Sequence, residues 1–272
     1  MKIGPYETGR VYQGDCIDLM KRLPDDCIPM IWTDPPYGSD FNNGDLIHRW
    51  EAAVGVTTTH EAEARPILND GREDMERVVS GMLDQAGRVL QKSSCVCCCC
   101  CCGGGGPTPL FAWLANRMDK KPLRFFHAVV WDKGGLGMGW RYRRNYEFVM
   151  VSHRKGGKLL WARDGSGLET GNVVRLGKIL PRADQHPTEK PTALVEHFLK
   201  LHTTPKDLVL DPFAGSGATG VACARMGRPF LGFELDPQWV KHANDRISAA
   251  QRGLTTKQSL GGQRTVFEAM KP

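Results

Sequence analysis

The sequence predicts an α/β fold in which helices cover both faces of a mainly parallel sheet. Short apolar stretches that are typical of buried strands alternate along the chain with stretches of helical period. Stretch 28–32 stops at Asp34, where two prolines follow that cannot donate hydrogen bonds to a neighbouring strand. Strands that alternate with helices build a parallel sheet with helices on both sides. The 272 residues suffice for one such domain.

The expected elements follow one another without a repeat or a linker. An apolar stretch within 9–18 ends at Gly14 and Asp15, and a helical segment, 19–23, comes next. Residues 73–90 carry apolar side chains at spacings of three and four, which is the pattern of an amphipathic helix. Further strands are expected at 28–32, 97–102, 125–131, 146–152, 208–211 and 230–233, and further helices at 107–118, 191–202 and 218–226. Residues 38–72 and 154–185 are polar and are expected to be long loops, which are usually functional.

Seven of the ten cysteines lie within 95–102, and six of these are consecutive. A disulfide framework spreads its cysteines along the chain, and zinc sites use spaced pairs, so the run matches neither pattern. We expect residues 97–102 to form an interior strand of the parallel sheet, in which reduced cysteines act as small apolar side chains. Consecutive strand side chains point to opposite faces, so six adjacent thiols cannot converge on one ion. The sequence therefore predicts no metal and no disulfide here.

Composition excludes several classes of protein. No apolar run reaches the roughly 18 residues that a membrane helix needs. The N-terminal residues lack the apolar core of a secretion signal, so we expect a cytoplasmic protein. The net charge of +6 permits a polyanionic partner without demanding one.

A glycine-rich loop, 211–217, joins an expected strand to an expected helix. Glycines at such a turn let a ligand approach the backbone closely. About twenty residues later, Glu234 ends the next strand, where an acid can accept hydrogen bonds from both ribose hydroxyls of a nucleoside cofactor. The loop alone would be an ordinary turn, but the two features together favour a cofactor site. The lysine of a phosphate-binding loop is absent from it.

Together with the tetrapeptide Asp34-Pro35-Pro36-Tyr37, this loop resembles the S-adenosylmethionine-dependent DNA amino-methyltransferases, the N6-adenine/N4-cytosine family. The catalytic tetrapeptide precedes the cofactor loop, as in the class called beta. Residues 186–191 resemble the motif just upstream of the loop in that class, and Gly14-Asp15 resembles the piece near the cofactor's adenine. The resemblance covers about residues 10–245. It implies a Rossmann-like methyltransferase fold, with one domain that carries DNA-recognition insertions.

The resemblance also implies roles for individual residues. The catalytic half is about 10–153, the cofactor half is about 186–250, the insertions are 38–72 and 154–185, and the tail, 251–272, is expected to be disordered. The expected catalytic residues are Asp34, Pro35, Pro36 and Tyr37. The residues expected to bind S-adenosylmethionine are Asp15, Cys16, Lys190, Asp211, Phe213, Gly215, Ser216, Gly217 and Glu234.

The chemistry of the tetrapeptide supports the same interpretation. An exocyclic amine is a poor nucleophile because its lone pair is delocalised into the base. Asp34 can accept one N–H and the carbonyl of Pro35 the other, which aims the lone pair at the methyl group. Tyr37 offers a flat face for a base that has been flipped out of double-stranded DNA. The basic residues Arg141, Arg143 and Arg144 suit contacts with phosphate, although a solvated charged run explains them equally well.

The leading hypothesis is methylation of adenine N6, because cytosine-N4 members of the family more often carry serine in place of Asp34. A cytosine-N4 enzyme and a catalytically dead DNA-binding protein with the same fold are the alternatives. A cytosine-C5 enzyme is disfavoured because the chain has no Pro-Cys pair. Many relatives form homodimers, which the sequence leaves open. The size resembles that of solitary phage-borne methylases, and the sequence does not imply a cognate restriction endonuclease.

Overall fold

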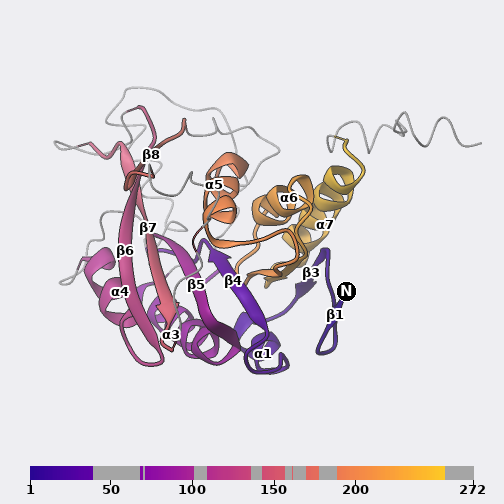
Figure 1. Ribbon diagram of the computed structural model, residues 1–272, viewed down its shortest axis with the longest axis horizontal. Helices are drawn as coiled ribbons and strands as arrows, with labels where there is room; N and C mark the ends of the chain where they lie inside the picture. Colours follow the sequence, from indigo (N-terminus) through magenta and orange to yellow (C-terminus); the bar gives the residue numbers. More distant parts are fainter. Residues whose placement is uncertain are drawn as a thin grey trace, which may run out of the picture.

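The computed structural model describes residues 1–38, 68–69, 71–100, 109–135, 143–156, 161, 170–177 and 189–254. Within these residues, eight strands form one sheet in the order β3-β10-β9-β4-β5-β7-β6-β8 (Figure 1). From one edge to the other, the strands are β3 (Arg10–Gln13), β10 (Phe230–Glu234), β9 (Val209–Asp211), β4 (Ile28–Thr33), β5 (Leu90–Cys100), β7 (Tyr146–Arg154), β6 (Leu123–Asp132) and β8 (Val173–Arg175). Two short strands, β1 (Lys2–Ile3) and β2 (Tyr6–Glu7), form a separate antiparallel pair.

The sheet is mainly parallel, as predicted. β7 is the exception among the described strands, because it runs antiparallel to both β5 and β6. β6 and β7 follow one another in the chain and are neighbours in the sheet, an arrangement that antiparallel strands allow without a crossover. The cysteine strand β5 is therefore interior, as expected, but it has one parallel and one antiparallel neighbour.

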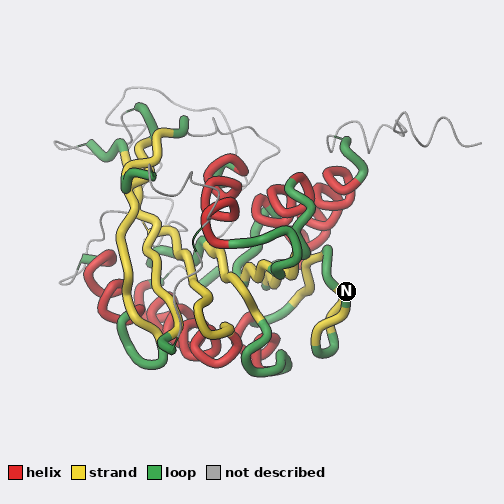
Figure 2. The backbone as a smooth tube through the Cα atoms, in the orientation of Figure 1, coloured by secondary structure: helices red, strands yellow, loops and turns green. Residues whose placement is uncertain are grey.

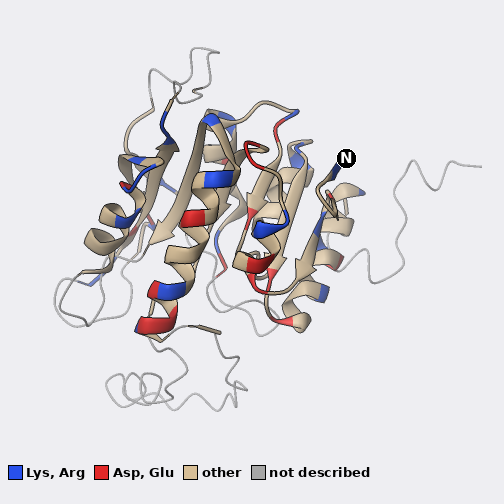
Figure 3. Cartoon of the chain, turned by 90° about the horizontal axis from the view of Figure 1, so that it is seen from below, with Lys and Arg blue, Asp and Glu red and all other residues tan. Residues whose placement is uncertain are grey.

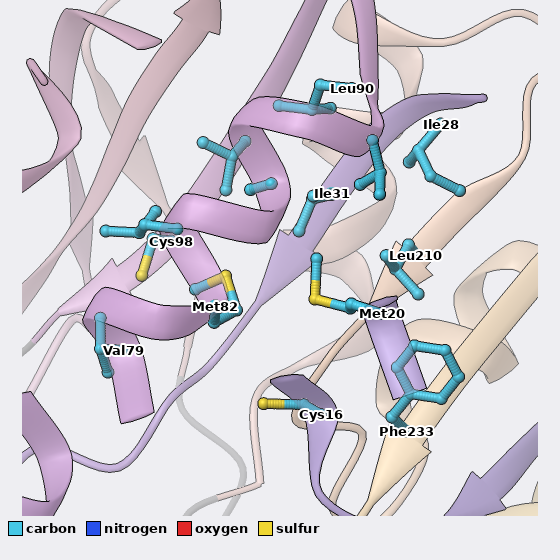
Figure 4. Packing of buried hydrophobic residues seen from close by; sticks show 14 of the residues in the cluster. Cys16, Met20, Ile28, Ile31, Val79, Met82, Leu90, Cys98, Leu210 and Phe233 are labelled. Atoms are coloured by element: carbon cyan, nitrogen blue, oxygen red, sulfur yellow. The ribbon is translucent and has the colours of Figure 1, made fainter. Parts of the chain in front are cut away.

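Helices cover both faces of the sheet (Figures 1 and 2). One face packs against α1 (Cys16–Lys21), α3 (Arg72–Val89) and α4 (Leu110–Met118). The other face packs against α5 (Thr192–His202), α6 (Ala218–Arg225) and α7 (Pro237–Gln251). Two hydrophobic cores result, one on each side of the sheet, and Figure 4 shows part of the first, where Met82 of α3 lies near Cys98 of β5.

The first helical layer has an outward surface of mixed charge (Figure 3). On α3, Arg77 pairs with Asp74 and Arg72 pairs with Glu76 within one or two turns. A surface of both signs does not attract a polyanion as a patch of one sign does. No described helix is long and apolar enough to cross a membrane.

Three parts of the fold lie outside the sequence predictions. Helix α7 was not predicted, although its sequence carries two start signals. Asp236 caps it by accepting a hydrogen bond from the Gln238 amide at 2.7 Å, and Pro237 occupies its first turn. The β1–β2 pair and β8 consist of only two or three residues per strand, too few to show a period. Helix α1 begins at Cys16, earlier than the expected 19–23, because Asp15 caps it.

Candidate active site

The candidate site lies at the carboxyl edge of the parallel strands, where strand order reverses. β4 and β9 are neighbours, but β4 continues toward α3 on one face of the sheet and β9 continues to α6 on the other. A crevice forms outside the strand ends at such a switch point. The predicted motifs at the ends of β3, β4, β9 and β10 meet there around one cavity, which is lined by Asp15, Cys16, Asp34, Pro35, Pro36, Tyr37, Lys190, Asp211, Phe213, Gly215, Ser216 and Glu234, among others.

The glycine-rich loop is held by two acids. Asp211 is buried, and its carboxylate accepts hydrogen bonds from the Phe213 amide at 3.1 Å and from the Thr219 hydroxyl. The Gly215 amide donates to Glu234 at 2.8 Å, and Gly215 has a φ of +48°, in the left-handed region that favours glycine. The loop is thereby tied to the end of β10.

Three acids around the cavity share an electrostatic property. Burial raises the pKa of Asp211 to about 7, and the nearby charges of Asp34 and Glu234 add to this increase. Burial also raises the pKa of Glu234 and that of Asp34. Each of these carboxylates would be more stable as an anion next to a positive charge. The cavity therefore favours a ligand that carries positive charge.

The carboxylate of Asp34 is held by two side chains. Lys190 donates to Asp34 Oδ2 at 2.7 Å, and the hydroxyl of Tyr37 donates to Asp34 Oδ1 at 2.6 Å. The Lys190 ammonium also lies over the Tyr37 ring, 5.2 Å from its centre. The orientation of Asp34 is thus fixed before any substrate arrives, while each of its oxygens keeps a second lone pair for a further donor.

A second carboxylate continues this network. Glu147 at the start of β7 lies 3.6 Å from the Lys190 ammonium through Oε2, and Lys133 donates to its Oε1 at 2.9 Å. Burial by itself would raise the pKa of Glu147, but Lys190 and Lys133 outweigh it and lower the pKa. Glu147 was not predicted as a site residue, although an acid within the apolar stretch 146–152 was a visible signal.

An ion pair joins the upstream motif to the glycine-rich loop. Arg246 of α7 donates to both carboxylate oxygens of Glu189, at 2.6 and 3.0 Å, and to the carbonyl of Ser216 at 2.8 Å. Glu189 is only 5% exposed in its side chain. This two-pronged contact fixes the loop relative to residue 189. It was not predicted, because α7 was not.

The other predicted site residues lie as follows. Asp15 lines the cavity and accepts the amide of Ile17 at 2.8 Å, and the adjacent Cys16 is buried. Gly217 is not among the described lining residues. It is the N-cap of α6 and packs against α7, where an added Cβ would lie 2.9 Å from the Cβ of Ala243. Arg143 and Arg144 are exposed just before β7.

Several predictions fall on undescribed residues or remain predictions. Arg141, residues 186–188 of the upstream motif, most of the proposed insertion 38–72 and residues 255–272 of the expected tail lie outside the described residues. Within the second insertion, 154–185, β8 joins the edge of the sheet beside β6. Lys190 lines the cavity, but its contacts in the structure are with Asp34, Glu147 and the Tyr37 ring, so its cofactor role stays a prediction.

Comparisons with known proteins agree on one family. A family model described as DNA methylase matches residues 28–245. The DNA adenine methyltransferase YhdJ of Escherichia coli (strain K12) is 24% identical, over 90% of this chain and 84% of its own length. The crystal structure of an M1.HpyAVI–SAM complex has a TM-score of 0.63 at 21% identity, covering 88% of this chain and 98% of its own. The PvuII DNA methyltransferase, which is cytosine-N4-specific, has a TM-score of 0.66 at 15% identity, covering 97% of this chain and 98% of its own. At these identities, the two structures establish the fold.

Proposed function

The chain belongs to the DNA methylase family, and on this premise we propose that it methylates the exocyclic N6 amine of adenine in double-stranded DNA. One observation carries the proposal: the Asp34 tetrapeptide and the loop at Asp211 meet at a single cavity although they lie far apart in sequence. A methyl donor bound by the loop and an amine held by the tetrapeptide would share this cavity, as transfer between them requires.

The cofactor is S-adenosylmethionine. When bound, it supplies an electrophilic methyl group on a positively charged sulfonium. The residues present fit such a group, because Asp34, Asp211 and Glu234 surround the cavity with carboxylates whose pKa burial has raised. We expect Glu234 to hold the ribose, and Asp15, Phe213 and Ser216 to hold the remaining parts of the molecule.

The side chains of the tetrapeptide would orient the base. Asp34 keeps free lone pairs on both oxygens and can accept one N–H of the amine, while the carbonyl of Pro35 accepts the other. Tyr37 lines the same cavity and would stack on the flipped base. Lys190 would keep Asp34 ionised and correctly aimed, since it donates a hydrogen bond to the carboxylate.

Adenine is favoured over cytosine by two observations. The tetrapeptide begins with aspartate, whereas the cytosine-N4 members of the family more often begin with serine. The relative YhdJ is by name a DNA adenine methyltransferase. The likeness to the cytosine-N4-specific enzyme concerns the fold alone.

Product analysis tests the proposal. Unmethylated duplex DNA would be incubated with the protein and S-adenosylmethionine, digested to nucleosides and analysed by mass spectrometry. We expect N6-methyldeoxyadenosine from the wild-type protein, and none from the Asp34→Ala variant. N4-methyldeoxycytidine would show that the chain is a cytosine-N4 enzyme. Cofactor binding without any methylated base would support the catalytically dead DNA-binding alternative.

A further inference from the structure

The thiols of β5 are divided between the two faces of the sheet. Cys95, Cys97 and Cys99 belong to the core beneath α5, α6 and α7, whereas Cys98 and Cys100 belong to the core beneath α1, α3 and α4. This division follows from the alternation of side chains along a strand. Six consecutive thiols cannot converge on one ion, but two thiols at alternate positions lie side by side on one face.

An imidazole meets this pair of thiols from the neighbouring helix. His202 is the last residue of α5, which stands beside β5 (Figure 1). The ligand atoms of Cys95, Cys97 and His202 all lie within 4.8 Å of one another, and all three side chains are buried. Ligand atoms on one tetrahedral zinc ion are about 3.5–3.8 Å apart, given bonds of about 2.3 Å to sulfur and 2.0–2.1 Å to nitrogen. Small side-chain adjustments would therefore suffice to bind an ion.

Aromatic rings hold the imidazole of this cluster in position. The His202 ring is kept in place by Phe198, with which it is stacked at 19°, and by the edge of Trp161.

A candidate fourth ligand lies on the next strand, outside the group of three side chains whose ligand atoms all lie within 4.8 Å of one another. His153 of β7 lies directly opposite Cys95 in the antiparallel register, so both side chains project from the same face of the sheet. Its Nδ1 atom is buried and has no hydrogen-bond partner among the described residues. A buried polar atom without a partner is costly, and coordination would satisfy it.

We propose that Cys95, Cys97 and His202 form a structural zinc site, with His153 as the fourth ligand. Two thiolates and two imidazoles in tetrahedral arrangement are a set that selects zinc, and a site closed by four protein ligands is structural rather than catalytic. The ion would join the C-terminal end of α5 to β5 and β7. Lys190 and Pro191 directly precede α5. The ion would therefore stabilise the helix that follows the Lys190–Asp34 contact.

Metal analysis tests the site directly. The untagged chain, purified in reducing buffer without added metal, should contain one zinc per chain by plasma mass spectrometry. After removal of the zinc and addition of cobalt(II), we expect intense absorption between about 600 and 750 nm and a thiolate charge-transfer band near about 350 nm, as for tetrahedral sulfur ligation. Both measurements use the wild-type chain, so they do not depend on whether a variant folds. Absence of both zinc and these bands would overturn the proposal.

A matched pair of double variants locates the ion. Cys95→Ala with Cys97→Ala should abolish stoichiometric zinc, whereas Cys98→Ala with Cys100→Ala removes the same number of thiols from the opposite face of β5 and should retain it. Equal loss in both would overturn the assignment of the ligands. His153→Ala should weaken zinc binding by at least about 10-fold, and unchanged affinity would overturn its place as the fourth ligand.

Discussion

Lys190 donates a hydrogen bond at 2.7 Å to the carboxylate of Asp34, from 156 residues further along the chain. Burial by itself would lower the pKa of Lys190, but Asp34 and Glu147 outweigh it and raise the pKa. The lysine is therefore charged at any physiological pH. It connects the motif that precedes the glycine-rich loop to the tetrapeptide, so the two halves of the site are joined by a charge pair as well as by the sheet.

We expect Lys190→Met to reduce turnover and to move the acid limb of the pH–rate profile to higher pH. Burial already raises the pKa of Asp34, and Lys190 opposes that increase, so removing the cation raises the pKa further. Steady-state rates between pH 5 and 9 measure the shift. Lys190→Arg, which keeps the charge, should restore most of the profile. An unshifted acid limb in Lys190→Met would contradict this role.

Asp34→Ala should lower the rate of methyl transfer by about 10²–10³-fold, as for the loss of one oriented polar group in a preorganised site. Affinity for S-adenosylmethionine should change little, because the proposed contact of Asp34 is with the base. Single-turnover transfer and calorimetric binding separate the two effects. Asp34→Asn keeps the shape of the side chain and serves as the comparison. Near-normal transfer by Asp34→Ala would remove the tetrapeptide from the mechanism.

Arg246→Met should weaken the binding of S-adenosylmethionine by about 1–3 kcal/mol, because it leaves the Glu189 carboxylate and the Ser216 carbonyl without their donor. Calorimetry on the folded variant measures the change. The matched control is Lys241→Met on the same helix, since Lys241 is 82% exposed and pairs only with Asp245, one turn away, in the contacts described. If both variants bound the cofactor equally well, the ion pair would not position the loop.

Binding of S-adenosylmethionine should strengthen as the pH rises from 6 to 8. The pKa of Asp211 is about 7 in the free protein, so its carboxylate is largely protonated below that value. A bound cation favours the ionised form and lowers this pKa, so binding at low pH releases a proton at a cost in free energy. Calorimetry in two buffers of different ionisation enthalpy detects the proton. Asp211→Asn should make the affinity for S-adenosylmethionine less dependent on pH. An affinity of the wild-type protein that falls with rising pH would contradict the prediction.

Gly217→Ala should destabilise the fold by more than Gly227→Ala. Both glycines have positive φ, +83° and +64°, so each alanine suffers backbone strain of about 1–2 kcal/mol. An added Cβ at Gly217 would also lie 2.9 Å from that of Ala243, whereas nothing lies within 4 Å at Gly227. Urea unfolding measures both differences. Equal losses would mean that close packing between α6 and α7 contributes nothing beyond backbone strain.

Much of the site could be predicted from sequence because its residues lie at strand ends. Asp34 and Glu234 each follow an apolar stretch, and the carboxyl ends of parallel strands share one edge, so local patterns place them together. The partners of Glu147 and Glu189 come from other elements, and no local pattern shows which charges will meet. The direction of β7 could not be predicted locally, because residues 148–151 form the continuous apolar run that is typical of a parallel strand. Helix α7 did carry its capping signal, Asp236 before Pro237, so its omission was an error of interpretation.

The pairing of β3 with β10 has a consequence for protein synthesis. Among the described strands, β3 pairs with β10 (residues 230–234) alone, and Asn244 of α7 bonds both the amide and the carbonyl of Val11. While the chain is being made on the ribosome, the first strand of the sheet must wait until residues 230–251 have emerged. Contacts this distant in sequence form late in folding. A nascent chain without residues 230–251 therefore lacks both Glu234 and the strand partner of β3, and its cofactor cavity is incomplete.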